Sequence, residues 1–263
     1  MGEGHGDAHP QSMPAIPRSG TWTSWRTELL VFGAAYLFYT AARWVFVGDL
    51  GEAREHARWI FELERDMGIA IEGSVQRALD SGVAKWLLSH LYLAAQLVVV
   101  PGVLLWLYRR SPHAYRELRN TVVATWLIAV PIFALFPVAP PRLADVGLVD
   151  TVSQHAGVEL TGRSTIFYNP LAAVPSLHVG FAFAVGIAAA ATVRSPWAKT
   201  AALLWGPLVS LSVVATGNHY VFDLAAGLAV TAAGFAAGSA ASSRNRHRLA
   251  VFAHRRPRSI LST

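Results

Sequence analysis

Apolar runs of membrane-spanning length constrain this chain more than any other feature of its sequence. A helix crosses the ~30 Å hydrocarbon layer of a bilayer in about 20 residues. Hydrophobic residues make up 53% of the 263 positions and charged residues only 14%, whereas an ordinary soluble domain carries about 25% charged residues. We assign six runs to membrane spans: 29–47, 83–108, 121–138, 177–193, 201–216 and 220–241. The predicted fold is therefore all-α, a polytopic membrane protein with six transmembrane helices in a bundle.

These runs define one domain, 29–241, between two tails. Residues 1–28 are polar and rich in Gly and Pro, and they lack the short apolar core of a cleavable signal peptide. We expect them to form a disordered cytoplasmic tail, and residues 242–263 to form a basic cytoplasmic tail. The chain has no cysteine, which excludes disulfide bonds and thiolate chemistry.

The basic residues between the spans predict the orientation in the membrane, because Lys and Arg gather in cytoplasmic loops. Fourteen of them precede span one, separate spans two and three or four and five, or follow span six, against six on the opposite side. We therefore expect a plasma-membrane protein with both termini in the cytoplasm. The net charge of +6 lies in loops and does not indicate a nucleic-acid partner. The basic tail is a topology anchor or, alternatively, also contacts anionic headgroups.

Two segments on the predicted outer side are long enough to carry structure of their own. In the segment 48–82, the apolar residues Trp59, Ile60, Leu63 and Met67 recur at helical spacing. We expect an amphipathic helix lying in the membrane interface between spans one and two, or alternatively a helix that binds a partner. The loop 139–171 is long for a compact membrane protein, and long loops are often functional.

A histidine and an aspartate stand at the start of the last span, in "GNHYVFD". His219 and Asp223 are four residues apart, so a helix places them on one face. A carboxylate in that position can accept the Nδ1–H of the imidazole and leave the other ring nitrogen available as a base or nucleophile. The alternative is a polar pair that only fixes the helix end. Titratable groups inside a membrane are costly, however, and function is the usual reason for them.

The fourth span begins with a second polar pattern, "VPSLHVG". Ser176 is a favourable N-cap residue after Pro175, and His178 follows within the first turn. The free amides and the dipole of a helix N-terminus favour a phosphate group. Arg142 follows span three in "APPRL". The loop charges place all of these residues on the outer side, together with His219.

In their order along the chain, the three motifs resemble those of the type 2 phosphatidic acid phosphatase superfamily, and in particular the branch of the inositol phosphorylceramide synthases. The family patterns KxxxxxxRP, PSGH and SRxxxxxHxxxD correspond here to "APPRL", "PSLH" and the stretch from Ser212 to Asp223. Leu135 stands where the first pattern has Lys, and Val213 where the third has Arg. The resemblance extends over about 39–227. Because Leu135 and Val213 replace a Lys and an Arg of the family patterns, the predicted phosphate site lacks two cations.

The resemblance implies specific roles for these residues. His219 would attack phosphorus and form a phosphohistidine, Asp223 would orient it, and His178 would act as general acid and base. Arg142, Ser176 and the amides of the helix N-terminus would hold the phosphate oxygens, and we add Asn218 as a further candidate for phosphate binding. We expect Arg43, near the outer end of span one, to replace a missing cation, unless it extends to the headgroups instead; Lys85 is a weaker candidate. No metal and no cofactor is expected.

The function that follows is an integral membrane lipid phosphatase or phosphotransferase, which acts on a membrane lipid and passes the phosphoryl headgroup to water, a polyol or a lipid alcohol. A headgroup phosphotransferase of the inositol phosphorylceramide synthase type is the first choice, and a simple lipid phosphate phosphatase is the alternative. Two further classes stay open. The histidines and Asp223 could form a two-His-one-carboxylate metal site, or the pair could relay protons in a transporter.

Overall fold

The structure of the chain, a computed structural model, describes residues 24–45, 48–158 and 170–254. Within this part of the chain the regular elements are helices, and the only strand-like feature is an isolated bridge between Val138 and Ala172. The all-α prediction is confirmed. Of the predicted tails, residues 1–23 and 255–263 lie outside the described residues, whereas 242–254 continue the last helix of the chain.

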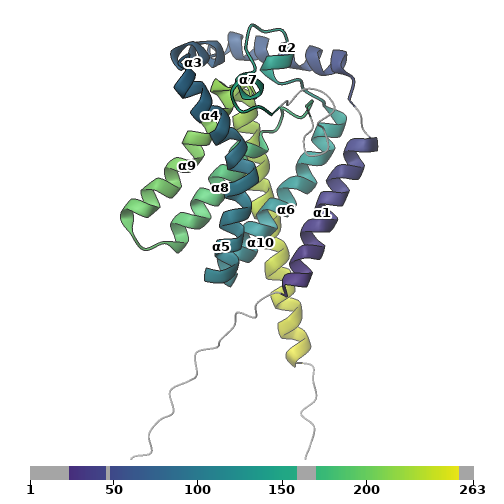
Figure 1. Cartoon of the computed structure of the whole chain (residues 1–263). Helices are drawn as coiled ribbons and strands as arrows, with labels where there is room; N and C mark the ends of the chain where they lie inside the picture. Colours follow the sequence, from purple (N-terminus) through teal and green to yellow (C-terminus); the bar gives the residue numbers. More distant parts are fainter. Residues whose placement is uncertain (1–23, 46–47, 159–169, 255–263) are drawn as a thin grey trace, which may run out of the picture.

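A bundle of long helices forms the body of the molecule, and helices that follow one another run in alternating directions (Figure 1). The start of the first helix and the end of the last lie at the same, lower end of the bundle in this view. The bundle consists of α1 (Trp25–Val45), α4 (Gly82–Ala94) continued through the π-helical turn η1 (Ala95–Val99) into α5 (Val100–Arg110), α6 (Pro112–Leu135), α8 (Leu177–Thr192), α9 (Pro196–Ala215) and α10 (Val221–His254).

Four helical stretches of the described chain are long and apolar enough to cross a membrane: Gly82–Arg110, Pro112–Leu135, Pro196–Ala215 and Val221–Ser243. They indicate a membrane protein. The helix α8 is apolar but has only 16 residues, which at 1.5 Å per residue is about 24 Å, less than the ~30 Å hydrocarbon layer. The helix α1 is not among the four. Six complete spans therefore stay a prediction.

Three helices begin four or more residues before the apolar runs predicted, because polar residues lie in their first turns; α1 begins at Trp25 rather than at 29. The helix α6 begins at Pro112, nine residues before the run at 121, and Ser111 caps it by accepting a hydrogen bond from Ala114 N. The helix α9 begins at Pro196 rather than at 201. Proline is favoured in the first turn, where its missing N–H has no partner to lose. Hydropathy alone therefore locates the apolar segment and misses the polar turn that starts the helix.

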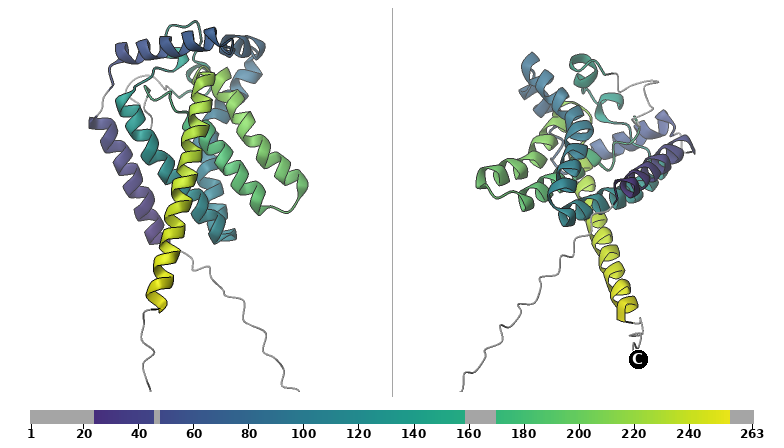
Figure 2. Two further views of the ribbon diagram at one scale, coloured as in Figure 1. Left: turned by 180° about the vertical axis from the view of Figure 1, so that it is seen from behind. Right: turned by 60° about the horizontal axis from the view of Figure 1, so that its bottom comes forward.

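Helix α2 (Leu50–Asp66) lies across the upper end of the bundle, next to the short α3 (Glu72–Ala78), as Figure 1 and Figure 2 both show. Near the same end lie η2 (Pro141–Leu143) and α7 (Thr151–His155). Every third or fourth residue of α2 is fully buried: Ala53, Ala57, Ile60 and Glu64.

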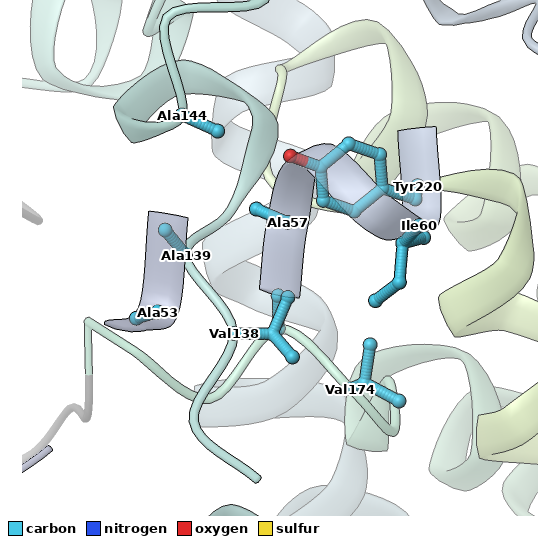
Figure 3. Packing of buried hydrophobic residues seen from close by; sticks show 9 residues of the cluster. Ala53, Ala57, Ile60, Val138, Ala139, Ala144, Val174 and Tyr220 are labelled. Atoms are coloured by element: carbon cyan, nitrogen blue, oxygen red, sulfur yellow. The ribbon is translucent and has the colours of Figure 1, made fainter. Parts of the chain in front are cut away.

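The apolar part of this buried stripe packs on the protein itself. Its partners are Val138, Ala139, Val174 and Tyr220, from the loop after α6, the loop before α8 and the start of α10 (Figure 3). Of the residues expected to face lipid, Ile60 is buried in this core, whereas Trp59 and Met67 are 56% and 61% exposed. Helix α2 is therefore a cover over one end of the bundle, and its contact with a membrane interface stays a prediction.

Two glycines let α8 and α10 pack closely where both helices begin. A Cβ added at Gly227 would overlap the backbone carbonyl oxygen of Ser176, and one added at Gly180 would overlap the Thr231 hydroxyl and approach Gly227 O. Glycine allows this backbone approach because it has no side chain. The first turn of α10 is thereby held against the first turn of α8.

A polar cluster ties the helices together at the opposite, lower end. Glu28 of α1 accepts hydrogen bonds from the Tyr115 hydroxyl (2.7 Å) and the Arg119 guanidinium (2.6 Å), both on α6. The next residue, Asn120, donates to the Ser242 hydroxyl of α10 at 2.9 Å. Because Glu28 is only 7% exposed, these bonds satisfy a carboxylate that would otherwise be costly to bury.

Candidate active site

His219 stands in the turn that joins α9 to α10, and its ring has a fixed orientation. The Nδ1 atom lies 2.9 Å from the carbonyl oxygen of Ala173 and 3.1 Å from Asp223 Oδ2. Both partners are hydrogen-bond acceptors, so Nδ1 must carry the proton of the neutral ring. The lone pair is therefore on Nε2, which is the nitrogen left for chemistry.

The surroundings of His219 keep the imidazole neutral. Its side chain is only 5% exposed, and burial together with the nearby charge of Arg142 lowers its pKa. The hydrogen bond to Ala173 opposes this shift. A neutral imidazole with a fixed tautomer is the form that can act as nucleophile or base.

Asp223 belongs to α10 and is fully buried. Its Oδ2 atom accepts two hydrogen bonds, one from His219 Nδ1 and one from the backbone N–H of Tyr220 at 2.9 Å. An acidic residue at the third helical position that reaches back to the cap residue is half of a capping box. The same carboxylate thus fixes the helix start and the histidine in front of it.

His178 reaches the site from the first turn of α8. Its ring centroid lies 5.9 Å from that of His219, with 54° between the planes. The Tyr92 ring of α4 stacks on the His178 ring, with 4.2 Å between the centroids and 17° between the planes. The structure therefore brings together the two imidazoles that the sequence placed at the starts of two separate helices.

Arg142 is held beside the histidines by three connections. Its Nη1 donates to Asn218 Oδ1 at 2.5 Å, its Nε lies 3.4 Å from Asp150 Oδ2, and its backbone N–H donates to Gly217 O at 3.0 Å. The side chain has no solvent exposure. Gly217 has a φ of 69°, which favours glycine. The Asn218 amide also donates to the Thr216 hydroxyl at 2.8 Å. Both ends of this amide are therefore hydrogen-bonded, and its oxygen orients Arg142.

Ser176 is the N-cap of α8, as predicted. Its hydroxyl accepts from Val179 N at 3.4 Å, and its own backbone N–H donates to Asp223 O at 3.1 Å. This backbone bond joins the start of α8 to the first turn of α10 directly. A phosphate contact of Ser176 stays a prediction, as it does for Asn218.

The two positions where the family patterns have cations hold apolar side chains in different settings. Leu135, at the end of α6, is 77% exposed, whereas Val213 is fully buried in an apolar cluster with Tyr92 and Val179. Of the candidates to replace them, Lys85 forms an ion pair with Asp80. The side chain of Arg43 lies outside the described residues.

Several residues near the histidines were missed by the sequence reasoning. Asp150 is readable as the N-cap of α7, where it accepts from Ser153 N, but nothing in the sequence pairs it with Arg142. Tyr92 and the Ala173 carbonyl give no local signal. The remaining two are Glu64 and Glu72, acidic residues that no sequence motif marked and that are fully buried.

A metal site is not formed by the titratable residues of the described chain, in which no three His, Asp or Glu side chains group suitably. The orientation of His219 explains this for the central residues. Its Nδ1 is directed to Asp223 and Ala173, so the carboxylate and the free Nε2 do not face a common point.

Comparison with known proteins gives one match. The family model described as the PAP2 superfamily matches residues 58–237, more than half of the chain, and this range includes all of the site residues above except Arg43. Neither a curated protein nor a solved structure matches the chain significantly.

Proposed function

Because the chain belongs to the PAP2 superfamily, we propose that it is an integral membrane enzyme that transfers a phosphoryl group from a lipid phosphate or phosphodiester through a phosphohistidine. The observation that carries this proposal is the geometry of His219. Two acceptors fix its Nδ1–H, at 2.9 and 3.1 Å, and the ring of His178 lies 5.9 Å away. One neutral nucleophile and one acid–base group therefore flank the same space.

The first step forms the bond between His219 Nε2 and phosphorus as the bond from phosphorus to the leaving oxygen breaks. His178, which takes up a proton in the complex with the anionic substrate, gives that proton to the leaving oxygen, so the lipid alcohol leaves uncharged. Asp223 stabilises the positive charge that develops on His219, through the hydrogen bond to Nδ1. General acid assistance of this kind contributes roughly 10²–10⁴ in rate.

The second step returns the enzyme to its starting state. An acceptor hydroxyl gives its proton to His178 while its oxygen bonds to phosphorus and the bond to His219 breaks. Water as the acceptor gives hydrolysis, and a polyol or lipid alcohol gives transfer. Positioning and charge stabilisation dominate such phosphoryl transfers, and we assign them to Arg142, Ser176, Asn218 and the first-turn amides of α8.

Transfer of a headgroup from a phosphodiester is the form we favour, as in the inositol phosphorylceramide synthases. The supporting observation is the pairing of Arg142 with Asp150 at 3.4 Å, which offsets part of the guanidinium charge. A phosphodiester carries one negative charge, whereas a phosphomonoester carries about 1.5 to 2 at neutral pH. A phosphodiester therefore needs less positive charge at this site for its charge to be compensated.

A second cation is still expected at the site, and Arg43 is the candidate. We propose that its guanidinium reaches the phosphate from the outer end of α1. Arg43→Lys should then lower turnover, because an ammonium cannot replace a bidentate guanidinium. Unchanged turnover in this variant would exclude the assignment.

We also propose that the site faces the outer side of the plasma membrane, as the loop charges predict, with α2 near the headgroups. The support is that Tyr220, next to His219, packs on Ala57 and Ile60 of α2. Helix α2 lies at the end of the bundle opposite to the one where α1 begins and α10 finishes (Figure 1). Labelling of the N-terminus in sealed cells would test this orientation.

The central experiment is a turnover screen with purified protein across lipid phosphates and phosphodiesters, with and without inositol or another polyol. His219→Ala should abolish turnover and the incorporation of ³²P into protein from a labelled donor. His113→Ala is the matched control, since His113 is 76% exposed at the start of α6. A His219→Ala protein with full turnover would refute the proposal. Product that appears only with the polyol would identify transfer.

A further inference from the structure

Two carboxylates, one from α2 and one from α3, bind the first turn of α10. Glu72 of α3 accepts a hydrogen bond from the backbone N–H of Val221 at 2.9 Å, and Glu64 of α2 accepts from that of Phe222 at 2.5 Å. These are the first two helical positions, whose amides have no carbonyl partner within their own helix. The segment that carries His219 and Asp223 is therefore attached to α2 and α3.

Both glutamates are completely buried, and each uses only one oxygen in this way. The other oxygens, Glu64 Oε2 and Glu72 Oε2, meet no donor from any other described residue. Two adjacent buried carboxylates cannot both be charged without a large cost, so one proton is retained between them.

The titration of Glu64 agrees with a retained proton. Burial, a hydrogen bond to Glu72 and the charges of Glu72 and Asp223 raise its pKa from 4.5 to about 8, while the bond from Phe222 N opposes the shift. Burial and the same three carboxylates raise the pKa of the neighbouring Tyr220 as well. The groups that face Glu64 are thus Glu72 from α3, and Asp223 and Tyr220 from the start of α10.

We propose that Glu64 and Glu72 are positioning residues of the active site: they share one proton, cap the first turn of α10 together, and so hold His219 and Asp223 in place. With Asp223 itself, they give the amides of Tyr220, Val221 and Phe222 a carboxylate each. Loss of the shared proton leaves Glu64 and Glu72 both negatively charged, next to the helix start that follows His219. The proposal rests on the proposed function, because it concerns the geometry of the same histidine.

The rival explanation is that the glutamates only stabilise the fold. The two ideas differ in what glutamine does at position 64. Its Oε1 can accept from Phe222 N and its Nε2 can donate permanently to Glu72, which replaces the shared proton by a hydrogen that cannot titrate. A purely structural role predicts no change in how kcat depends on pH.

The test measures kcat against pH for the wild type, Glu64→Ala, Glu64→Gln and the control Glu62→Gln, whose side chain is exposed on the same helix. In the wild type kcat falls as the pH rises through about 8. Glu64→Ala lowers kcat about 10-fold or more, since a misplacement of about 1 Å can cost about 10²-fold. Glu64→Gln recovers most of this loss and lacks the alkaline fall, whereas Glu62→Gln keeps it.

A second measurement needs no substrate. A group whose folded-state pKa is raised stabilises the fold fully below its unfolded pKa and loses that contribution as the pH rises to the folded value. The unfolding temperature of the wild type in detergent therefore falls between about pH 4.5 and 8 through Glu64. This component is absent in Glu64→Gln and present in Glu62→Gln.

The two measurements separate the possible failures. If no lipid is turned over, or His219→Ala is fully active, the proposed function fails, and the unfolding series still tests the shared proton. An alkaline fall in kcat that persists in Glu64→Gln, or a Glu64→Ala protein with wild-type kcat, would overturn the positioning role. Equal pH dependence of unfolding in Glu64→Gln and the wild type would overturn the shared proton.

Discussion

Helices α8 and α10 both begin at the candidate site, but their N-termini are capped very differently. At α10 the carboxylates of Asp223, Glu64 and Glu72 accept hydrogen bonds from the backbone N–H groups at the start of the helix. At α8 a hydroxyl, that of Ser176, caps the helix through one bond of 3.4 Å. The start of α10 is therefore capped by three acidic side chains of the protein, whereas the start of α8 is capped by one neutral hydroxyl.

The difference suggests two uses of the same physical property. A helix N-terminus carries roughly half a positive charge and attracts anions. At α10 this attraction holds acids of the protein, which fix the nucleophile His219. At α8 the amides of Leu177 and His178 have no carbonyl of their own helix to donate to, and we propose that they meet the anion of the substrate. The predictions below test this division, from the largest expected effect to the smallest.

Asp223→Asn should have the largest effect and lower kcat about 10³-fold. An amide can present its N–H to His219 Nδ1 and so favour the wrong tautomer, which in a serine-protease triad costs about 10⁴-fold. Asp66→Asn, at the exposed end of α2, is the control. Steady-state kinetics and ³²P labelling of the protein measure the outcome, and a loss below about 10-fold would show that the carboxylate does not orient the histidine.

Gly227→Ala should lower kcat about 10-fold to 100-fold, because the added Cβ overlaps Ser176 O and separates the two helix starts. The free energy of unfolding should fall by about 1–3 kcal/mol, as for other overpacked sites. Gly102→Ala is the matched control, since a Cβ there has no atom within 4 Å. Wild-type kinetics in Gly227→Ala would mean that the close crossing does not set the distance between the histidines.

Tyr92→Leu should reduce kcat/KM about threefold to tenfold through the loss of the stack on His178. Aromatic pairs contribute about 0.5–1.5 kcal/mol beyond their buried area, and each 1.36 kcal/mol is a factor of ten in rate. Tyr92→Phe keeps the ring and should restore most of the activity. If Phe and Leu behave alike, the ring does not position His178.

Ser176→Ala should have the smallest effect. Loss of an N-cap costs about 0.5–2 kcal/mol of stability, and we expect KM to rise about twofold to threefold with little change in kcat. Thermal unfolding and kinetics measure the two parts. A loss in kcat as large as that of Asp223→Asn would break the comparison, because α8 would then carry chemistry as well as binding.

Local spacing in the sequence determined much of the candidate site. His219 and Asp223 are four residues apart, and a helix start places such a pair within hydrogen-bond distance, as found at 3.1 Å. The N-cap at Ser176 was readable for the same reason. Charged loops and apolar runs likewise predicted an all-α chain with helices of alternating direction. Each of these features depends on the residue types of single segments of the chain and not on contacts between distant segments.

The sequence alone did not reveal features that depend on distant contacts. Helix α2 has an amphipathic pattern that fits a membrane surface equally well, and only the fold decides that Ile60 packs on the protein. Glu64 and Glu72 look like ordinary surface acids until Val221 and Phe222, about 150 residues later, supply their donors. The pairing of Arg142 with Asp150 is equally invisible in a motif.

The division has a physical reason. Hydropathy and helical periodicity are properties of neighbouring residues, so the sequence determines which segments are helical and apolar and which residues share a helix face. The pKa of a buried titratable group, and the cost of burying its charge, depend on every group within a few ångströms, whatever its place in the chain. Only the tertiary structure, through the close approach of α8 and α10 at Gly180 and Gly227 and the packing of α2 and α3 above them, decided which acids surround the histidine and how they are compensated.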